Sequence, residues 1–254
     1  MDTTMPPTAQ QRLVERQRPS GPVVMYQRWE QLLFLHWKWD ADLVQQALPP
    51  GLRVDRFNGA AWLGLVPLFM RDVRPRFAPS VPMISNFLEL NVRTYVYDAL
   101  GRPGVYFFSL DCDQPIAVQM ARTFFNLRYE HAVLQASVDD EGWVNFDAQR
   151  SDHPEKNHFR YRGFGPAGEA FPESIEFFLV ERYRLFASDG DGEQLNSARI
   201  CHAPYLMRQA QVTDWSDGML RLAGFDPKGR APDHICYSAG VAMEAFAPER
   251  VEDV

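Results

Sequence analysis

The chain has 254 residues, of which 46% are hydrophobic and 23% are charged. These proportions are typical of a globular protein that buries a substantial core without disulfides or metals. The formal net charge of −7 disfavours nucleic acid and anionic membrane surfaces as partners.

The sequence also bears on the cellular compartment of the protein and on the boundaries of its domain. Three scattered cysteines fit a reducing environment, and no apolar run is long enough to span a bilayer. The polar, proline-containing start lacks the apolar segment of a secretory signal. We therefore expect a cytoplasmic protein with no membrane partner, and a homo-oligomer remains open. We expect residues 1–24 to be a flexible arm, residues 25–247 one domain, and residues 248–254 a loose tail.

The first predicted elements lie between residues 29 and 70. Trp29–Trp39 is apolar and aromatic-rich, which predicts a buried strand. Asp40 then predicts the N-cap of a short helix over residues 41–48. Asn58-Gly59 is a strong hairpin signal, so we expect the segments on either side of it to pair as strands. Residues 71–82, with three prolines, predict a loop near the mouth of a pocket.

A cleanly alternating strand follows from Glu89 to Tyr97. Its polar positions share one face and its aliphatic positions the other. The Gly101–Gly104 turn then predicts a hairpin partner over residues 105–110. Asp113 predicts the N-cap of a helix from Gln114 to about Phe125.

The rest of the chain predicts short strands joined by tight turns. They comprise a hairpin of 128–138 with 143–149, a strand at 159–164, helices at 173–180 and 216–222, a hairpin of 183–187 with 195–202, and a closing strand at 234–245. Many strands and few short helices predict an α+β fold that is mainly antiparallel β. The strand count alone leaves a β-sandwich open.

Several short motifs follow one another along the chain. They are FLHW at Phe34–Trp37, LPPGL at Leu48–Leu52, AWLGLVP at Ala61–Pro67, ELNVRTYV at Glu89–Val96, GVYFFSLD at Gly104–Asp111, ERYRLFA at Glu181–Ala187 and the cluster His202-Ala203-Pro204-Tyr205. Together they resemble the YqjF-like proteins, the uncharacterised DUF2071 family, over roughly residues 29 to 208. That family is grouped in fold with acetoacetate decarboxylase. The resemblance therefore implies a β-cone or barrel around a central pocket.

The resemblance fails at the residue that carries the decarboxylase's chemistry. In that enzyme the central helix carries an arginine and leads into a segment with two lysines, one of which forms a Schiff base with the substrate. Here Arg122 matches the arginine, but Tyr129 and Glu130 stand in the two lysine places. A phenol cannot form an imine. We therefore predict that Schiff-base acetoacetate decarboxylase activity is absent. Lys38 is the one other lysine that deserves a test.

The candidate site residues come from these central segments. Glu89, Asn91 and Arg93 form a polar row that lines a pocket, faces solvent, or satisfies itself as a Glu–Arg pair. The resemblance favours a pocket, because Glu89 aligns with a pocket glutamate of the decarboxylase. The candidate ligand-binding residues are Glu89, Asn91, Arg93, Arg122 and Tyr129. Tyr129, His131 and Glu89 are candidates for acid–base catalysis, with ordinary packing as the alternative.

No metal or cofactor is predicted. His202, His234 and Cys236 lack the spacing of a known metal motif, and Asp189-Gly190-Asp191-Gly192 fits a hairpin turn better than a calcium loop. We therefore expect a protein that binds a small anion, in particular a carboxylate. The alternatives are an acid–base enzyme, of lyase or hydrolase type, acting on a small organic acid or ketone, and a structural or assembly protein with an occluded pocket.

Overall fold

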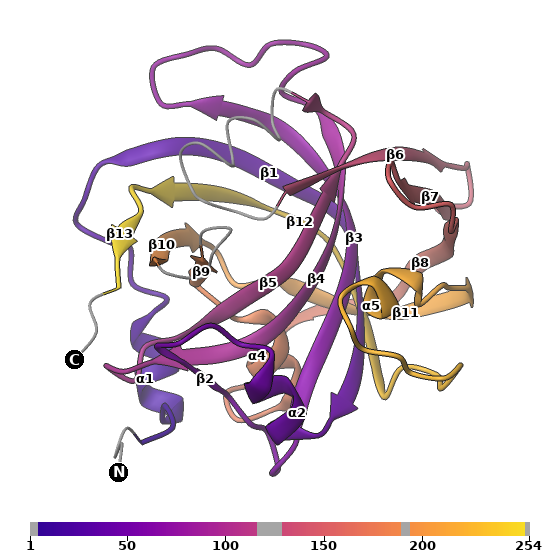
Figure 1. Ribbon diagram of the computed structural model, residues 1–254. Coiled ribbons are helices and arrows are strands. Elements are labelled where there is room, and N and C mark those ends of the chain that lie inside the picture. The colour runs from indigo at the N-terminus through magenta and orange to yellow at the C-terminus, as the bar shows by residue number, and fades with distance from the viewer. Residues whose placement is uncertain (1–4, 116–128, 189–193, 252–254) are drawn as a thin grey trace.

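The computed structural model describes residues 5–115, 129–188 and 194–251, and these form mostly strands (Figure 1). The described helices are short: α1 (Ala9–Val14), α2 (Ala41–Gln46), α4 (Ile175–Val180) and α5 (Gly218–Leu222). The first strands are β1 (Val23–Trp39), β2 (Leu52–Val54), β3 (Ala61–Pro75), β4 (Phe87–Asp98) and β5 (Pro103–Cys112). The remaining strands are β6 (Tyr129–Val138), β7 (Val144–Arg150), β8 (Asn157–Glu169), β9 (Arg184–Ser188), β10 (Leu195–His202), β11 (Leu206–Asp214), β12 (His234–Phe246) and β13 (Glu249–Arg250).

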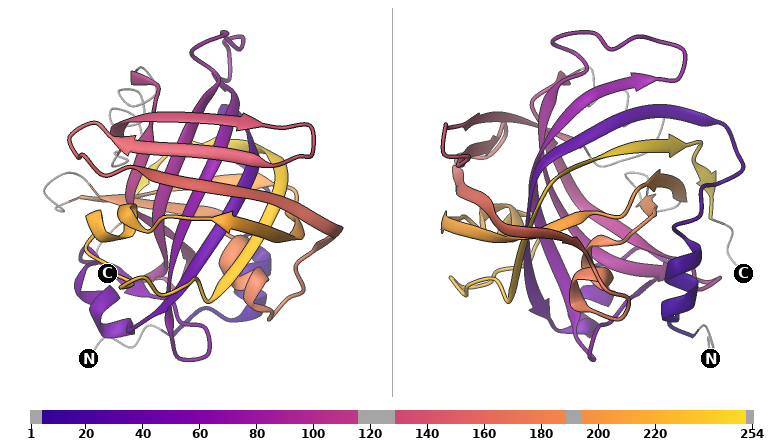
Figure 2. Two further views of the ribbon diagram at one scale, coloured as in Figure 1. Left: turned by 90° about the vertical axis from the view of Figure 1, so that its right-hand side faces the viewer. Right: turned by 180° about the vertical axis from the view of Figure 1, so that it is seen from behind.

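The described strands form one sheet in the order β13-β10-β9-β5-β6-β7-β8-β11-β12-β1-β3-β4-β2. Two further pairings, β4 with β5 and β10 with β12, curl this sheet into a ring-like wall without making a true barrel (Figure 2). Only β5–β6 and β5–β9 are parallel among the described pairs. The predicted α+β class with mainly antiparallel pairing is therefore confirmed.

The strands β12-β1-β3-β4-β5 form a shared wall with side chains packed on both faces. On one face Leu90 packs in a cluster with Phe146 and Phe159 from β7 and β8. On the other face Tyr95 packs in a second cluster with Phe34 and with Phe178 of α4. Every residue of β4 is buried as a result. Because β4 lies between two cores, its row of polar side chains must also lie inside the protein.

Several predicted elements are confirmed and one pairing is wrong. Asp40 caps α2 as expected, with its side chain accepting from the amides of Asp42 and Leu43. The hairpin expected around Asn58-Gly59 shrinks to a single bridge between Phe57 and Ala60. β2 pairs with β4 instead of β3. The strand β11 and the extension of β3 through Pro75 were not predicted, because neither segment has a clean apolar alternation.

The segments expected to be a flexible arm and a loose tail contain short elements that contact the domain. The segment before β1 contains α1, closed by a capping box between Thr8 and Gln11. Arg12 of α1 makes a buried ion pair with Asp55. Glu249–Arg250 pairs with β10 as β13, and the following Val251 is buried. Charged side chains that looked solvated in the sequence are thus used in ion pairs with the domain.

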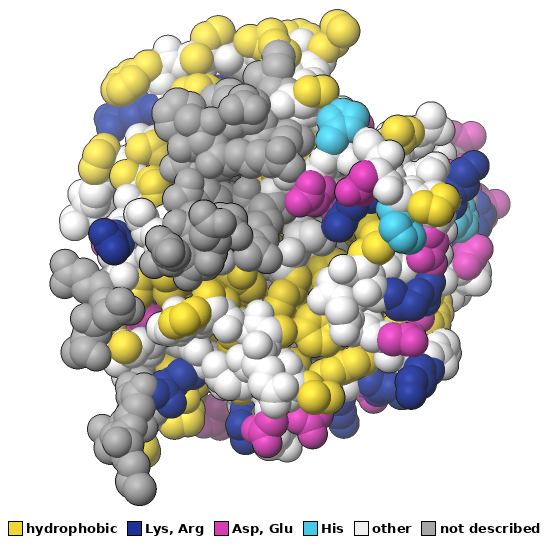
Figure 3. All heavy atoms as spheres, in the orientation of Figure 1, with side chains coloured by type: hydrophobic (Ala, Val, Ile, Leu, Met, Phe, Trp, Pro, Cys, Tyr) yellow, Lys and Arg dark blue, Asp and Glu magenta, His cyan; other side chains and the backbone are white. Residues whose placement is uncertain are grey.

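The segment between β3 and β4 carries exposed apolar side chains. Phe77 is 92% exposed and Met83 is 85% exposed. Figure 3 shows hydrophobic side chains at the top of the view, where Figure 1 draws the segment between β3 and β4. The predicted helix from Gln114 to Phe125 lies almost entirely outside the described residues. No helix in the described ranges is long and apolar enough to cross a membrane.

Candidate functional site

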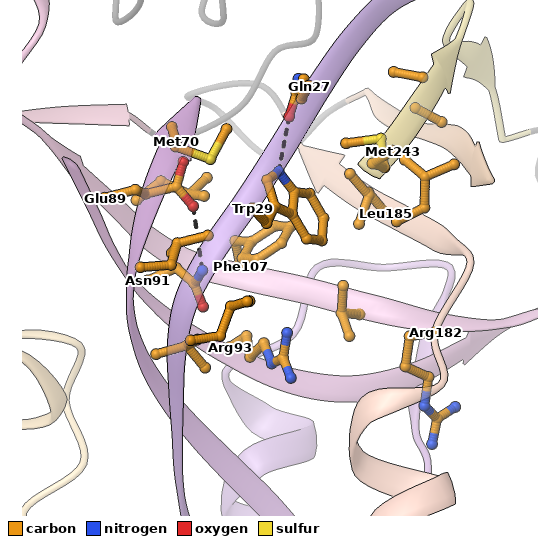
Figure 4. A pocket seen from close by; sticks show the side chains of 18 of the residues that line it. Gln27, Trp29, Met70, Glu89, Asn91, Arg93, Phe107, Arg182, Leu185 and Met243 are labelled. Carbon is orange, nitrogen blue, oxygen red and sulfur yellow. Dashed lines mark hydrogen bonds between the residues drawn. The ribbon is translucent and has the colours of Figure 1, made fainter. Parts of the chain in front are cut away.

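A cavity lies against the shared wall, on the side of Tyr95 and α4 (Figure 4). Its atom-free space, including the open solvent at its mouth, is about 830 Å³. Strands β1, β3, β4 and β5 supply one part of its lining, and β9, β10 and β12 supply another. The lining side chains are mostly apolar or aromatic, and the polar ones are Gln27, Glu89, Asn91, Arg93, Tyr129, Arg182 and Tyr205.

The polar row of β4 faces this cavity. Figure 4 shows Glu89, Asn91 and Arg93 following one another along the strand on the same side. They are 4%, 5% and 8% exposed, so none is a surface residue. Asn91 donates from Nδ2 to Glu89 Oε1 at 3.2 Å, while its own Oδ1 is buried and has no partner among the described residues. The row therefore presents an acid, an amide and a cation to one enclosed space.

Glu89 is bound by Tyr129 of β6, a strand that is separated from β4 by β5. The Tyr129 hydroxyl donates to Glu89 Oε2 at 2.6 Å. Burial raises the pKa of Glu89, and the hydrogen bonds from Tyr129 and Asn91 oppose this rise only in part. Burial also raises the pKa of Tyr129, with the Glu89 charge adding to the effect. The phenol therefore stays protonated and acts as a donor, while Glu89 can take up a proton more readily than an exposed glutamate.

Arg93 lies at the other end of the row, with its guanidinium packed between aromatic rings. Its Cζ is 5.2 Å from the Phe34 ring centroid and 5.6 Å from that of Tyr95. Nη2 donates to the Leu179 carbonyl at 3.2 Å, and Nε is buried with no hydrogen-bond partner in the part of the chain that the structure describes. No carboxylate of the described residues forms a salt bridge with Arg93. Within the described ranges, its charge is thus surrounded by aromatic rings and one carbonyl, with no counter-ion.

Space for Arg93 depends on a glycine in β3. Gly64 lies opposite Arg93 in the β3–β4 register. A Cβ added to Gly64 would lie 3.1 Å from Arg93 Cγ and 3.3 Å from His36 Cδ2. The missing side chain of Gly64 therefore makes room for both groups.

A second buried arginine borders the cavity. Arg182 donates from Nη1 to Asp55 Oδ2 at 2.9 Å, and Asp55 also accepts from Arg12 of α1. Arg182 Nη2 has no partner among the described residues. Burial, reinforced by the charge of Arg12, lowers the pKa of Arg182 to about 10. Two arginines share one aspartate here, so this side of the cavity also carries excess positive charge.

Behind Arg93, a chain of hydrogen bonds leads toward the surface. His36 Nε2 lies 2.8 Å from the Tyr95 hydroxyl, and its Nδ1 lies 3.3 Å from Nδ1 of His234. His234 Nε2 in turn lies 3.3 Å from Glu176 Oε1 on α4. Burial lowers the pKa of His36, with the charges of His234 and Arg93 adding to the effect. This arrangement keeps His36 neutral beside Arg93.

The structure brings together four of the predicted site residues: Glu89, Asn91, Arg93 and Tyr129. His131 is not with them, since it is exposed and its Nδ1 lies 2.7 Å from Ser151 Oγ. Arg122 lies outside the described residues. Lys38 is also exposed, with its ammonium 5.6 Å from the Trp62 ring centroid. None of the three lysines lines the cavity.

The residues considered for a metal have other partners. His202 stacks on Tyr183 with ring centroids 4.5 Å apart, while His234 lies beside His36. Across the described ranges, no group of three or more histidine, cysteine, aspartate or glutamate side chains could hold a metal ion.

Several lining residues were not predicted, notably Trp29, Arg182 and Tyr205. Two of them lay in the motifs ERYRLFA and His202-Ala203-Pro204-Tyr205, which were noted only as family matches. The motif ERYRLFA contains a glutamate and two arginines, so nothing in the sequence singled out Arg182. Trp29 carried no such signal, because an aromatic residue at the start of a strand is usually core.

The DUF2071 family, described as an uncharacterized conserved protein, matches residues 26–242. The uncharacterized protein YqjF of Bacillus subtilis (strain 168) is 35% identical over 194 residues, which is 76% of this chain and 79% of that protein. Both matches cover most of the domain, including the row on β4 and its partner Tyr129.

Solved structures extend the likeness in fold. Acetoacetate decarboxylase from Legionella pneumophila superposes with a TM-score of 0.62 at 13% identity, over 99% of this chain and 94% of that one. An acetoacetate decarboxylase-like enzyme from Sphingomonas wittichii RW1 gives 0.62 at 12% identity, over 91% and 94%. The enduracididine biosynthesis enzyme MppR complexed with pyruvate gives 0.60 at 13% identity, over 92% of each chain. The fold is therefore acetoacetate decarboxylase-like, and the chain belongs to the DUF2071 family.

Proposed function

We propose that this protein binds a small carboxylate-bearing molecule in the cavity beside β4. The observation that supports this best is Arg93, which is 8% exposed and has no carboxylate partner among the described residues. A buried guanidinium is costly unless an anion compensates its charge. A ligand carboxylate would provide that compensation and would be held by charge-assisted hydrogen bonds.

The surroundings of Arg93 fit a small organic acid better than an inorganic anion. Trp29, Met70 and Phe107 provide apolar wall next to the polar row (Figure 4). Such a mixture of apolar wall and few polar groups is typical of small-molecule sites. MppR, of similar fold, has been solved with pyruvate, which is itself a small carboxylate. The similarity in fold to MppR supports a small carboxylate as the class of ligand and says nothing about which one.

A thermal-shift screen with short-chain carboxylates tests the proposal. We expect stabilisation of the wild-type protein and its loss in Arg93→Met, which keeps an unbranched side chain but removes the charge. Lys38→Ala is the matched control, because it removes an exposed cation that does not line the cavity. If no acid stabilises the wild type, or if Arg93→Met responds equally, the proposal fails.

A second candidate function is acid–base catalysis at Glu89. The observation that favours it is the 2.6 Å hydrogen bond from Tyr129 to a buried glutamate whose pKa is raised by burial. A carboxylate with a raised pKa takes up a proton more readily than an exposed one, as a general base must. Deuterium exchange at the α-carbon of a bound acid or ketone, followed by NMR, would reveal such activity. Glu89→Gln should abolish the exchange while leaving acid binding by Arg93 intact.

A further inference from the structure

Glu89 and Arg93 on β4 have opposite charges, and neither forms a salt bridge with another of the described residues. Glu89 accepts hydrogen bonds from Tyr129 and Asn91, and no cationic nitrogen of the described residues forms a salt bridge with it. Arg93 donates to a carbonyl and contacts aromatic rings, with no acid partner. Both line the same cavity, yet they do not pair with each other.

Their separation explains why they do not neutralise one another. Glu89 and Arg93 are four residues apart on one strand, so their Cα atoms are about 13 Å apart at about 3.3 Å per residue. Asn91 lies between them, and its buried Oδ1 has no partner in residues 5–115, 129–188 and 194–251. The cavity wall therefore has an acidic end, an unsatisfied amide acceptor in the middle, and a cationic end.

Other charged groups lie near the Arg93 end and near the Glu89 end of this wall. Arg182, which also borders the cavity, has a buried Nη2 without a described partner and adds positive charge. At the other end, Asp111 acts by its charge on Glu89 and is itself bound by Arg150, which does not line the cavity. The apolar residues Trp29, Met70 and Phe107 lie beside the row (Figure 4). A ligand complementary to this wall is dipolar, with a short apolar chain.

We propose that the ligand is an amino-carboxylic acid of the ω-amino type, with its carboxylate at Arg93 and its ammonium group at Glu89. This inference rests on the proposed carboxylate binding and specifies the second end of the ligand. The ammonium group would donate to the Glu89 carboxylate and to Asn91 Oδ1, and so satisfy the acceptors that the protein leaves buried. A simple fatty acid would compensate Arg93 alone.

Titration calorimetry with four six-carbon probes tests this: hexanoate, 6-aminohexanoate, adipate and hexylamine. We expect 6-aminohexanoate to bind about ten- to a hundredfold more tightly than hexanoate, the difference expected for charged hydrogen bonds. Adipate should bind worse than hexanoate, because its second carboxylate would meet Glu89. Glu89→Gln keeps the shape of the side chain and should remove the advantage of the amino group, so that the variant binds 6-aminohexanoate no more tightly than hexanoate.

The outcomes separate this inference from the proposed function. If hexanoate binds and 6-aminohexanoate binds no better, or if Glu89→Gln leaves the preference intact, the dipolar ligand is wrong and carboxylate binding still stands. If none of the three acids binds, carboxylate binding itself fails. Circular dichroism and thermal unfolding without ligand establish that Glu89→Gln is folded. Lys38→Ala, outside the cavity, should show the wild-type order of affinities.

Discussion

Tyr129 donates a 2.6 Å hydrogen bond to Glu89 inside the cavity, at the place where the resemblance to the decarboxylase would put a lysine. A Lys–Glu arrangement would offer a nucleophilic amine, whereas this pair offers a protonated phenol and a carboxyl of raised pKa. Tyr129 can therefore donate a hydrogen bond to Glu89 but cannot form an imine.

Removing the Tyr129 hydroxyl tests how strongly it supports the Glu89 carboxylate. The hydrogen bond from Tyr129 lowers the pKa of Glu89, so Tyr129→Phe should raise that pKa further above its ordinary value. A raised folded-state pKa means that stability falls as pH rises from about 4.5 through the folded value. We expect the variant to lose about 1–3 kcal/mol relative to wild type at pH 8, and less at pH 5.

Urea unfolding at the two pH values measures this difference. Tyr26→Phe is the control, because the Tyr26 ring packs under Arg74 away from the cavity. Equal losses at pH 5 and pH 8 in Tyr129→Phe would show that the hydroxyl does not act on the charge of Glu89.

A second prediction concerns acid sensitivity. Burial lowers the pKa values of His36, His202 and His234, and in His36 the charges of His234 and Arg93 add to this. Below about pH 6.5 the unfolded chain then binds more protons than the folded protein, so stability is lost as pH falls. Each fully neutral buried histidine contributes up to about 1.4 kcal/mol per pH unit to that slope.

His36→Gln should therefore flatten the stability profile between pH 7 and pH 5, whatever its effect on absolute stability. Glu89, whose pKa is raised by burial, contributes with the opposite sign and is unchanged in this comparison. The free energy of unfolding measured by urea titration at several pH values gives the slope. An unchanged slope would mean that His36 is not held neutral by its surroundings.

Gly64 provides a steric test of the Arg93 site. A Cβ at this position would lie 3.1 Å from Arg93 Cγ, so Gly64→Ala must displace the side chains that the cavity relies on. We expect a loss of about 1–3 kcal/mol in stability, as in other overpacked cores, together with weaker acid binding. Gly168→Ala in β8 is the control, because a Cβ there meets nothing within 4 Å. Wild-type stability and binding in Gly64→Ala would show that Arg93 does not need this space.

The absence of an imine mechanism is also testable. Lys38, Lys156 and Lys228 are all exposed, and none lines the cavity. Borohydride treatment in the presence of acetoacetate, followed by mass spectrometry, should therefore yield no covalent adduct in the cavity and no release of carbon dioxide. An adduct on Lys38, with decarboxylation that Lys38→Ala abolishes, would overturn this expectation.

The strand β4 and its two faces could be predicted because polar and apolar residues alternate along this segment of the sequence. Alternation separates Glu89 and Arg93 from Leu90 and Val92, and the structure places these two sets on opposite faces of the shared wall. The sequence could not decide whether the polar face was solvated, since that depends on strands β9 and β10, which are remote in the chain. Resemblance to the family, rather than periodicity, favoured the interior.

The errors arose where distant segments override local signals. Asn58-Gly59 forms its turn, with positive φ at both residues, but β2 pairs with β4 and the turn joins no hairpin. Arg12 looks like a solvated charge in a polar arm, yet its partner Asp55 lies 43 positions further along the chain. Arg182 and Tyr205 reach the cavity in a similar way, from segments with no periodic signal of their own.

The central claim is that Arg93 anchors a carboxylate in the cavity, and calorimetric titration of hexanoate into wild type and Arg93→Met measures it most directly. The account predicts saturable binding to the wild type and an affinity lower by at least about tenfold in Arg93→Met, the loss expected for a charge-assisted hydrogen bond. Lys38→Ala should titrate like the wild type. Equal affinities in wild type and Arg93→Met, or no binding to the wild type at all, would contradict it.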